Sequence, residues 1–338
     1  GMLRIASSTS CFDSRHVGAA SSRGSRPSSG RRSSERRATG ARREAREPTA
    51  LADLTEVEDV KVGDPAALTA RWAAATRARE SALHSSLFTD PFAARLAGEE
   101  GWGFRHGQVS IVDVARTKFI DEFVYTQYSH GVRQFVVLGA GMDARAFRLR
   151  GVEEACFFEV DKVPLFAVKE PLMARVRLTC AAREVVELDL QEPGADLAAA
   201  LEAKGHKKAE PTAWIIEGLI YYLGPQLVER TMATIGALSA PGSAAVHDAV
   251  SASFIAAGGP HLDEMRMLRV PWLSGHDDYS GLWASHGFDW CDVLDLNYLF
   301  VDRERRALIL DPKRPKYKPH HGRRRELTFF VTALKRRL

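Results

Sequence analysis

A strand that runs directly into a glycine-rich turn constrains the fold of this 338-residue chain more than any other feature. The apolar run 135–138 ends at Gly139-Ala140-Gly141, and a helix-compatible stretch follows at 144–149. Because glycine has no Cβ atom, Gly139 and Gly141 can adopt positive φ and let a ligand approach the backbone. The pattern is typical of a nucleotide-type site at the end of a buried strand.

Short apolar segments alternate with helical stretches along the following part of the chain. Strands are predicted at 134–138, 155–160, 184–188, 213–217 and 243–248, with helices at 144–149, 163–175, 194–204 and 225–239 between them. This alternation predicts an α/β protein with a doubly wound, mostly parallel sheet. Two further strands are expected at 288–293 and 326–334, and the alternating apolar residues of the last one indicate an antiparallel closing strand.

The folded body is expected to be one domain with additions before and within the sheet. We expect this domain to span 49–338, with a helical cap at 49–132, a sheet core at 133–338 and an insertion at 251–280. The pairs Asp64-Pro65 and Asp90-Pro91 are typical helix starts, with Asp as the cap and Pro in the first position. The insertion is either a lid over the strand ends or a plain connecting segment.

The first 48 residues have a different composition from the rest. Residues 1–50 contain 11 Arg, no Lys and 4 acidic residues, whereas the whole chain carries a net charge of +4. This segment therefore carries +7 and leaves −3 on the remainder, which argues against a nucleic-acid partner. An Arg- and Ser-rich, acid-poor segment indicates either a disordered tail or an organelle transit peptide over 1–48.

Composition also limits the compartment and the metal chemistry. The apolar runs are too short to cross a membrane, so no membrane association is expected. Four scattered cysteines without a C-x-x-C pair argue against a disulfide framework and a structural zinc site. We therefore expect a cytoplasmic protein, or a plastid or mitochondrial one if 1–48 is a transit peptide. His320-His321 has no companion ligands at metal spacing, so no metal site is predicted.

The glycine-rich turn fits two cofactors. Its run G-A-G-M-D-A satisfies the loose dinucleotide fingerprint G-x-G-x-x-G/A, which allows an NAD-dependent oxidoreductase. It equally fits S-adenosyl-L-methionine (AdoMet). Asp161 lies about twenty residues further on, where an acidic side chain can accept the hydroxyls of a ribose in either cofactor. Glu159 competes with Asp161 for this role, because residues two apart on a strand share a face.

A series of motifs in a fixed order favours AdoMet. They are Arg77-Ala78 with Glu80, Asp90-Pro91-Phe92-Ala93, the segment 116–121, Arg133-Gln134, LGAGMDARAFRL at 138–149, Phe158-Glu159-Val160-Asp161, Asp189-Leu190 and the segment 217–223. Through them the chain resembles the leucine carboxyl methyltransferase family, including related bacterial O-methyltransferases. The resemblance implies a Rossmann-like class I AdoMet-dependent methyltransferase with a seven-stranded sheet whose last strand is antiparallel.

Candidate cofactor-binding residues follow from the strand ends and from this resemblance. Arg116 can bind the carboxylate of AdoMet bidentately. Asp189 can accept the adenine amino group, and Leu190 can stack on the ring. The full set of expected cofactor contacts is Arg77, Arg116, Gly139, Gly141, Asp161, Asp189, Leu190 and Glu217.

Two of these residues, and one neighbour, carry further expectations. Glu217 ends an apolar run and therefore needs a charged or main-chain partner. Arg77 is matched only through the resemblance. Asp143 is expected to cap the helix that follows the turn.

Catalytic candidates are fewer, and the acceptor stays open. Aromatic rings near a sulfonium are favourable, but core filling is the alternative for both Tyr221 and Tyr222. Tyr222 is preferred, because it matches a family tyrosine near the transferred methyl. A carboxylate acceptor is already ionised and needs no base, whereas a hydroxyl acceptor needs one. His247, oriented by Asp248 or another carboxylate, is the only histidine proposed for that task, and a structural role is its alternative. The expected acceptor is a small, polyketide-like molecule; a protein C-terminal leucine and a non-catalytic AdoMet-binding role are the alternatives.

Overall fold

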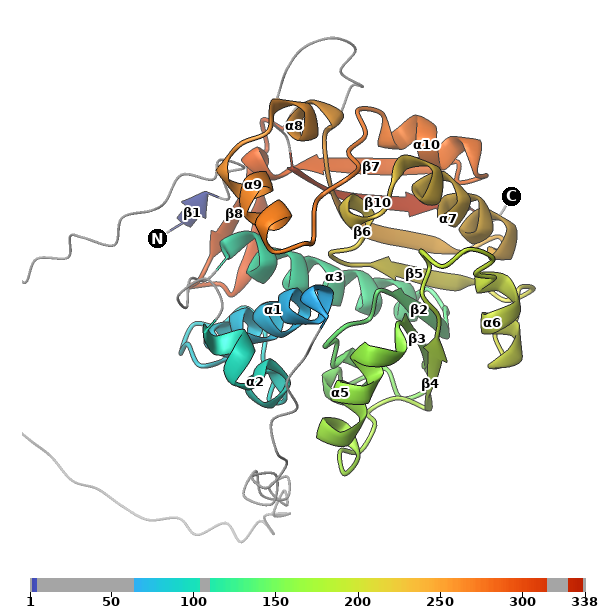
Figure 1. Ribbon diagram of the computed structural model, residues 1–338, viewed down its shortest axis with the longest axis horizontal. Helices are drawn as coiled ribbons and strands as arrows, with labels where there is room; N and C mark the ends of the chain where they lie inside the picture. The colour runs from blue at the N-terminus through green and yellow to red at the C-terminus, as the bar shows by residue number, and fades with distance from the viewer. Residues whose placement is uncertain (1, 5–63, 104–109, 315–327, 337–338) are drawn as a thin grey trace, which may run out of the picture. The chain divides into compact units, whose positions relative to one another are not determined.

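The computed structural model describes residues 2–4, 64–103, 110–314 and 328–336 (Figure 1). Residues 5–63 lie outside the described ranges. The predicted tail at 1–48 and the start of the predicted cap therefore have no structural account, apart from Met2–Arg4. None of the helices within the described ranges is long and apolar enough to cross a membrane.

A seven-stranded sheet confirms the predicted fold class. In spatial order it consists of β4 (Ala182–Glu187), β3 (Cys156–Asp161), β2 (Gln134–Leu138), β5 (Thr212–Ile216), β6 (Ala244–Val250), β10 (Thr328–Leu334) and β7 (Trp290–Asp295). The first five strands are parallel, and β10 runs antiparallel to both β6 and β7. The strand order reverses between β2 and β5, which is where the carboxyl ends of an open α/β sheet form a crevice.

Helices cover both faces of this sheet (Figure 1). The helices before the sheet are α1 (Pro65–Ser81), α2 (Ala93–Gly103) and α3 (Ile111–Ser129). Between the parallel strands lie α4 (Arg145–Arg148), α5 (Val163–Met173), α6 (Leu197–Ala203), the 3-10 turn η3 (Ile220–Tyr222) and α7 (Pro225–Leu238). After β6 follow α8 (Ala252–Ala257), α9 (Pro260–Met267) and α10 (Tyr279–Ser285).

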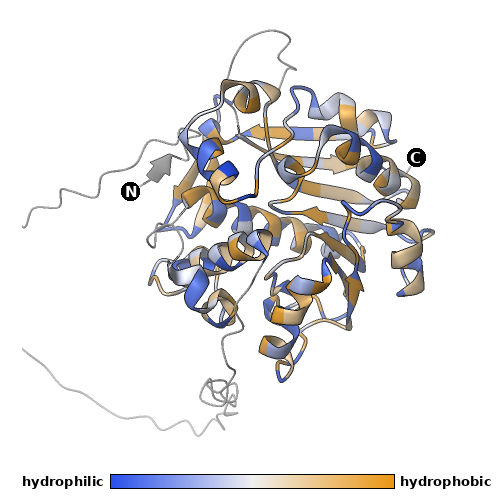
Figure 2. Cartoon of the chain, in the orientation of Figure 1, coloured by the Kyte–Doolittle hydropathy of each residue, from blue (hydrophilic) through white to orange (hydrophobic). Residues whose placement is uncertain are grey.

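Side-chain alternation along the strands separates the two apolar layers. Phe135 and Val137 of β2 pack with residues of α1, α2, α3 and α5 in one cluster. Val136 and Leu138 face the other way and pack with residues of α6, α7 and α10. Every residue of β2 is buried, and Figure 2 shows the strands of the sheet largely in the hydrophobic colours. The strands are therefore apolar on both faces, as expected for a parallel sheet between two helical layers.

One of the two predicted helix starts is correct and the other is displaced. Asp64 caps α1, because its Oδ1 accepts the N–H of Ala66 at 2.8 Å. Asp90 was expected to cap a helix with Pro91 in the first position, but α2 begins only at Ala93. The Asp90 carboxylate instead accepts a hydrogen bond from Nε of Arg77 at 2.9 Å, in addition to one from the N–H of Phe92 at 3.1 Å. A tertiary ion pair therefore accounts for an acidic residue that the sequence assigned to a cap.

A small second sheet was not predicted. It pairs β8 (Leu299–Asp302) antiparallel with β9 (Ala307–Leu310) and with β1 (Met2–Arg4). The short turn η4 (Leu296–Tyr298) leads into it from β7. Buried Glu80 of α1 accepts both guanidinium nitrogens of Arg303, at 2.9 and 3.0 Å, which ties this hairpin to the helical cap. The hairpin was missed because its strands have only four residues each.

Glu159 in the middle of β3 is buried as part of an ion-paired group. Its Oε2 accepts Nζ of Lys169 at 2.6 Å and Nη2 of Arg183 at 2.7 Å. Glu159 and Lys169 are at most 1% exposed. A buried carboxylate is tolerated only when its charge is matched and its oxygens are hydrogen-bonded. This group is therefore a structural element that joins α5 to β3 and β4.

Replacing Lys169 by Met should lower the free energy of unfolding by about 3 kcal/mol, because it leaves part of a buried negative charge without its partner. The measurement is equilibrium denaturation of the variant and of the parent protein. Lys207→Met is the matched control, since its ion pair with Glu210 is exposed and should contribute no more than about 1 kcal/mol. Equal losses in the two variants would contradict this account of β3.

Candidate active site

The glycine-rich turn after β2 has the geometry that the sequence predicted. Gly139 and Gly141 have φ of 65° and 44°, which non-glycine residues rarely adopt. A Cβ atom at Gly139 would lie 3.0 Å from Leu219 Cδ1, and one at Gly141 would lie 3.0 Å from Ala70 Cβ. The turn therefore excludes larger residues both by its backbone and by the closeness of the neighbouring chain.

Asp161 lies beside this turn, at the end of β3. Its Oδ2 accepts the N–H of Gly141 at 2.6 Å, and its Oδ1 accepts the N–H of Lys162 at 2.7 Å. Burial raises the pKa of the Asp161 carboxyl, and the two backbone N–H groups offset part of that rise. Glu159, the competing residue, is instead held in its ion pairs with Lys169 and Arg183. Of the two acids, the structure brings only Asp161 to the turn.

Arg116 of α3 lies among three carboxylates from separate parts of the chain. Its Nε donates to Glu217 Oε1 at 3.0 Å, and its Nη1 contacts Asp248 Oδ2 at 2.8 Å and Asp113 Oδ1 at 3.1 Å. Burial lowers the pKa of Arg116, but the neighbouring carboxylates, Asp248 foremost, hold it well above its usual value. Among the described residues no hydrogen bond uses Nη2, so that nitrogen can still meet the carboxylate of a ligand.

Arg145 supplies the second guanidinium, and sequence reasoning missed it. Its Nη1 donates to Glu217 Oε2 at 2.7 Å and also bonds to Asp143, and its Nε donates to Asp121 Oδ1 at 2.8 Å. Glu217 directly follows β5 and is therefore bridged between Arg116 and Arg145, which satisfies the expectation that it needs a partner. Burial raises its pKa, yet the two guanidinium groups hold the pKa of Glu217 below its usual value.

Asp143 was predicted to cap the helix after the turn, and in the structure its carboxylate also forms an ion pair. Its Oδ1 accepts the N–H of Arg145 at 2.6 Å, at the first residue of α4, while the helix cap position itself is Ala144. The other oxygen pairs with the guanidinium of Arg145. Although burial raises it, the pKa of Asp143 is lowered to about 2, chiefly by Arg145. The carboxylate thus holds the turn and the guanidinium of Arg145 together.

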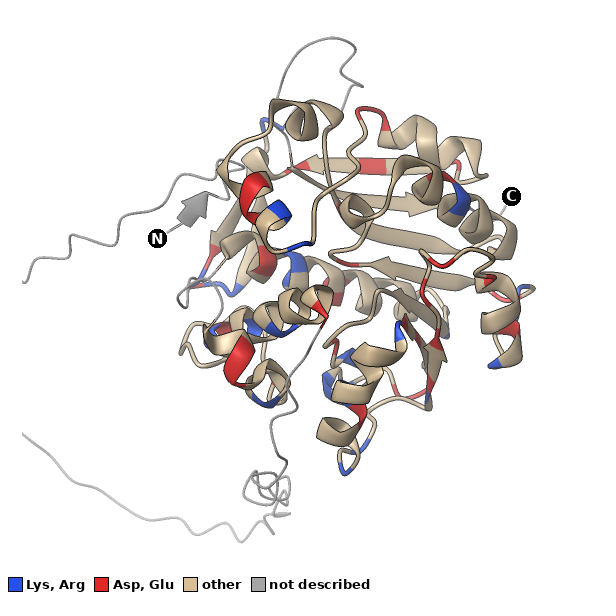
Figure 3. Ribbon diagram, viewed as in Figure 1, with Lys and Arg blue, Asp and Glu red and all other residues tan. Residues whose placement is uncertain are grey.

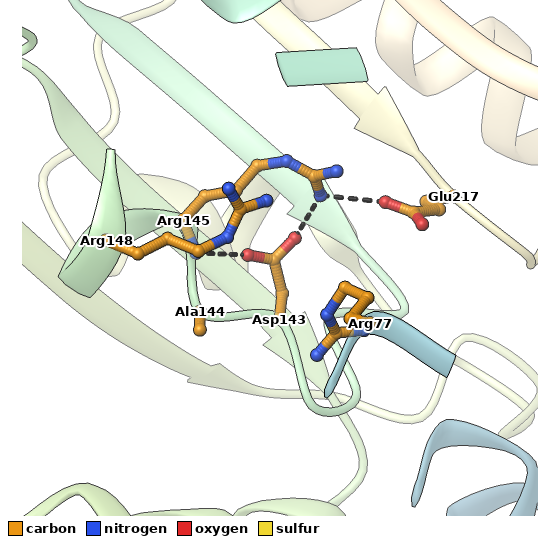
Figure 4. Close-up of a pocket in the computed structure, with 6 residues that line it drawn as sticks. All are labelled: Arg77, Asp143, Ala144, Arg145, Arg148 and Glu217. Atoms are coloured by element: carbon orange, nitrogen blue, oxygen red, sulfur yellow. Dashed lines mark hydrogen bonds and ion pairs between the residues drawn. The ribbon is translucent and has the colours of Figure 1, made fainter. Parts of the chain in front are cut away.

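These charged side chains surround a small pocket (Figure 4). Its lining residues are Arg77, Asp143, Ala144, Arg145, Arg148 and Glu217. Arg77 reaches it from α1 and donates Nη2 to the main-chain oxygen of Met142 within the turn. Figure 3 shows the strands mostly uncharged, with acidic and basic residues gathered on helices and loops. The pocket is therefore a polar exception within an apolar sheet core.

The predicted adenine residues lie after the next strand along the sheet. Asp189 follows β4; its Oδ1 accepts the N–H of Gln191 at 2.9 Å and its Oδ2 lies 3.5 Å from Nζ of Lys162. Leu190 packs against the apolar layer of α6 and α7, and its main-chain oxygen accepts Nη2 of Arg230 at 2.9 Å. Because β4 neighbours β3, both residues lie at the same edge of the sheet as Asp161. Their contact with adenine stays a prediction.

Three aromatic residues, Tyr221, Tyr222 and Trp272, form an aromatic wall near Arg116. The hydroxyl of Tyr221 lies 3.3 Å from Arg116 Nη1 and donates to Asp248 Oδ2 at 3.2 Å. Trp272, from the segment after β6, stacks on Tyr221 with ring centroids 4.0 Å apart and meets Tyr222 edge-on at 6.2 Å. Burial raises the pKa of Tyr221 well above its usual value and also raises that of Tyr222. Both tyrosines therefore stay neutral.

His247 lies outside this group of residues, and its assignment as a base oriented by the Asp248 carboxylate is wrong in geometry. Neighbouring residues of a strand point to opposite faces, so Asp248 faces α3 while His247 faces α10. Its Nε2 accepts Nε1 of Trp283 at 3.0 Å, and its Nδ1 lies 3.2 Å from the main-chain oxygen of Asp248. Burial lowers the pKa of His247 to about 4. The structure therefore gives the ring a packing role.

Three other histidines among the described residues follow β6 in the chain. His261 packs edge-on against Trp272, with ring centroids 4.7 Å apart. Nδ1 of His276 accepts the N–H of Asp278 at 3.0 Å, and His286 contacts Glu229. The pair His320-His321 lies outside the described residues.

The buried, neutral His247 should make stability fall with acid. Above about pH 6.5 the ring is neutral in both the folded and the unfolded protein. Below that pH the unfolded chain binds a proton, whereas the buried ring of the folded protein stays neutral down to about pH 4. When the pH falls from 7 to 5, the free energy of unfolding should therefore decrease by about 2 kcal/mol more in the parent protein than in His247→Gln. Denaturant unfolding of both proteins at the two pH values measures this difference, and equal losses would contradict a neutral buried ring.

Several known proteins are similar to this chain. The leucine carboxyl methyltransferase family model matches residues 70–236. A proposed S-adenosyl-L-methionine-dependent methyltransferase of Mycobacterium avium is 34% identical over 270 residues, covering 72% of this chain and 81% of that protein. One of Frankia alni is 38% identical over 190 residues, which cover 52% of this chain and 65% of the Frankia protein. A solved DUF574 family structure from Streptomyces avermitilis has a TM-score of 0.46 at 13% identity, covering 78% and 97% of the two chains.

The match with the family model includes the helical cap from α1, the glycine-rich turn and the end of β5. The same turn also fits a dinucleotide by its sequence pattern alone, and the relatives decide in favour of AdoMet. The chain therefore belongs to the leucine carboxyl methyltransferase family and is an enzyme that depends on S-adenosyl-L-methionine.

Proposed function

We propose that this protein transfers the methyl group of AdoMet to an oxygen atom of a small-molecule acceptor, with a hydroxyl group favoured over a carboxylate. The observation that carries the proposal is the excess of negative charge around Arg116. Among the described residues, the connected ion pairs join four guanidinium groups to six carboxylates. The guanidinium groups are those of Arg77, Arg116, Arg145 and Arg148, and the carboxylates are those of Asp90, Asp113, Asp121, Asp143, Glu217 and Asp248.

This charge excess suits the donor and disfavours one class of acceptor. AdoMet supplies a methyl group on a positively charged sulfur, and it also carries an ammonium group. Both cations are stabilised beside excess carboxylates, because charges interact strongly at a partly buried site. An anionic acceptor would be repelled there, whereas a neutral hydroxyl would not. The electrostatics therefore support a hydroxyl acceptor.

The residues that would hold AdoMet fit its chemical groups. Nη2 of Arg116 would meet the carboxylate, and the turn of Gly139 and Gly141 would lie against the methionine part. Asp161 would accept the ribose hydroxyls, with its present backbone bonds fixing its orientation. Asp189 and Leu190 would receive the adenine. Arg77 and Glu217 would act beside these contacts, through Met142 and through Arg116 respectively.

The acceptor side would be the aromatic wall of Tyr221, Tyr222 and Trp272. The segment after β6 adds Phe254 and Leu262, which pack in one cluster with the two tyrosines. These side chains offer an apolar surface to the body of a small acceptor and would exclude water from the reacting atoms. This arrangement supports the 251–280 insertion as a lid. Catalysis would rest on holding the acceptor oxygen in line with the methyl group.

A carboxylate acceptor is the second candidate, because the matching family model is that of leucine carboxyl methyltransferase. This class of acceptor includes the C-terminal carboxylate of a protein as well as small carboxylic acids. Such an acceptor would need no base. It would, however, have to approach a site that already contains more carboxylates than guanidinium groups.

Asp161→Asn should weaken AdoMet binding by about 2–3 kcal/mol, or about 30–150-fold in Kd, because it removes a charged acceptor for the ribose hydroxyls. Isothermal calorimetry on the folded variant measures the change. Glu202→Gln, an exposed carboxylate on α6, is the control and should bind as the parent does. An unchanged Kd in Asp161→Asn would remove Asp161 from the cofactor site.

The acceptor class is tested with AdoMet labelled in its methyl group. We expect label transfer to members of a panel of phenols and alcohols with apolar bodies, and little transfer to the matching carboxylic acids or to peptides ending in leucine. Base-stable products indicate ethers and base-labile products indicate methyl esters. Transfer to carboxylates alone would reject the hydroxyl proposal in favour of the second candidate.

A further inference from the structure

The carboxylates around Arg116 differ in how many of their oxygens accept hydrogen bonds. Those of Glu217, Asp248, Asp143 and Asp161 each accept hydrogen bonds at both oxygens, from the guanidinium groups, from Tyr221 or from backbone N–H groups. Both oxygens of each of these four carboxylates are therefore already occupied by donors, and none of the four presents an unsatisfied oxygen to a new hydroxyl group. These four acids therefore serve as structural or binding groups.

Asp113 differs from them. Its Oδ1 lies 3.1 Å from Arg116 Nη1, but its Oδ2 has no hydrogen-bond partner among the described residues. The residue is only 8% exposed, so water does not freely compensate this oxygen. An unsatisfied buried polar atom in a native structure calls for a ligand or a chemical role.

The position of Asp113 points to the acceptor side of the site. Arg116 directs Nε toward Glu217 at the end of β5, and Nη1 toward Asp113, Asp248 and the hydroxyl of Tyr221. Tyr221 is the residue on which Trp272 stacks. The free oxygen of Asp113 therefore belongs to a carboxylate on the aromatic side of Arg116 and not on the side of the glycine-rich turn.

We propose that Asp113 is the general base of the methyl transfer, an inference that rests on the proposed hydroxyl acceptor. Its Oδ2 takes the proton of the acceptor hydroxyl as the acceptor oxygen bonds to the methyl carbon. The bond between that carbon and sulfur breaks, its electron pair stays on sulfur, and the proton remains on Asp113 until it is released to solvent. No oxidant or further reactant is needed.

The surroundings of Asp113 tune its proton affinity in the required direction. Burial raises the pKa of its carboxyl, and the nearby carboxylates of Asp248 and Glu217 add to this. Arg116 and the hydroxyl of Ser110 act in the opposite sense, and the net pKa is above that of an ordinary Asp. A base is most effective when its pKa approaches the working pH. The other titratable neighbour, Tyr221, is neutral and already donates to Asp248.

The decisive variant is Asp113→Asn, which keeps an oxygen for Arg116 but cannot accept the proton. Single-turnover transfer is followed with two probes, phenol, which is un-ionised at pH 8, and 4-nitrophenol, which is ionised there. Transfer to phenol should fall about 10²–10⁴-fold in the variant. The 4-nitrophenolate anion should be the slower acceptor in the parent, because the excess carboxylates repel it. Its transfer should nevertheless fall less than about tenfold in the variant, because it needs no base. Glu122→Gln is the matched control, an exposed carboxylate on the same helix, and should leave both rates unchanged.

Two measurements keep the test independent of overall folding and of the acceptor. AdoMet affinity of Asp113→Asn should stay within about fivefold of the parent. In a carbon-13 NMR titration, the Asp113 carboxyl, assigned by its absence in the variant, should titrate above the ordinary range of Asp, about 3.9. Equal losses with both phenols, no loss with phenol, or a carboxyl that titrates at or below that range would each overturn the proposal. Failure of the parent to methylate any hydroxyl would instead reject the proposed function.

Discussion

The position of Glu217 between Arg116 and Arg145 is the interaction on which the site depends. The three residues come from the end of β5, from α3 in the helical cap and from α4 after the glycine-rich turn. Both guanidinium groups are nearly buried, so none of these charges is freely hydrated. Buried ion pairs are stable only when they are complete, and removing one member leaves an unmatched charge. The cap, the turn and the sheet are therefore fixed relative to one another by this carboxylate.

The same pairs divide the site into two chemical sides. Toward the turn, Asp143 and Asp161 hold backbone N–H groups and leave little freedom to Gly141 or Arg145. Toward the lid segment, Arg116 meets Asp113, Asp248 and Tyr221, which is packed beneath Trp272. Arg116 thus stands between the proposed cofactor side and the proposed acceptor side. Its partners carry more negative than positive charge, which is the basis for preferring a cationic donor with a neutral acceptor.

Features encoded within a few residues were predictable. Alternation of strands and helices gave the sheet, with strand boundaries within about two residues of those observed. The turn at Gly139 and the cap at Asp64 are also local, because each needs only one backbone geometry. The start of α2 and the hairpin of β8 and β9 were not predictable. Asp90 is held by a distant Arg77, and the hairpin gains its place from the ion pair of Glu80 with Arg303.

The sequence by itself determined the fold class, the turn and the order of the candidate residues, because period, glycine content and spacing are properties of neighbouring positions. Only the tertiary structure decided which charges meet. It joined Arg145 and Asp248 to the group around Arg116, and it placed His247 on the opposite face of β6. It also left one oxygen of Asp113 without a partner among the described residues. Long-range ion pairs link positions about a hundred residues apart, and no local pattern records which carboxylate reaches which guanidinium.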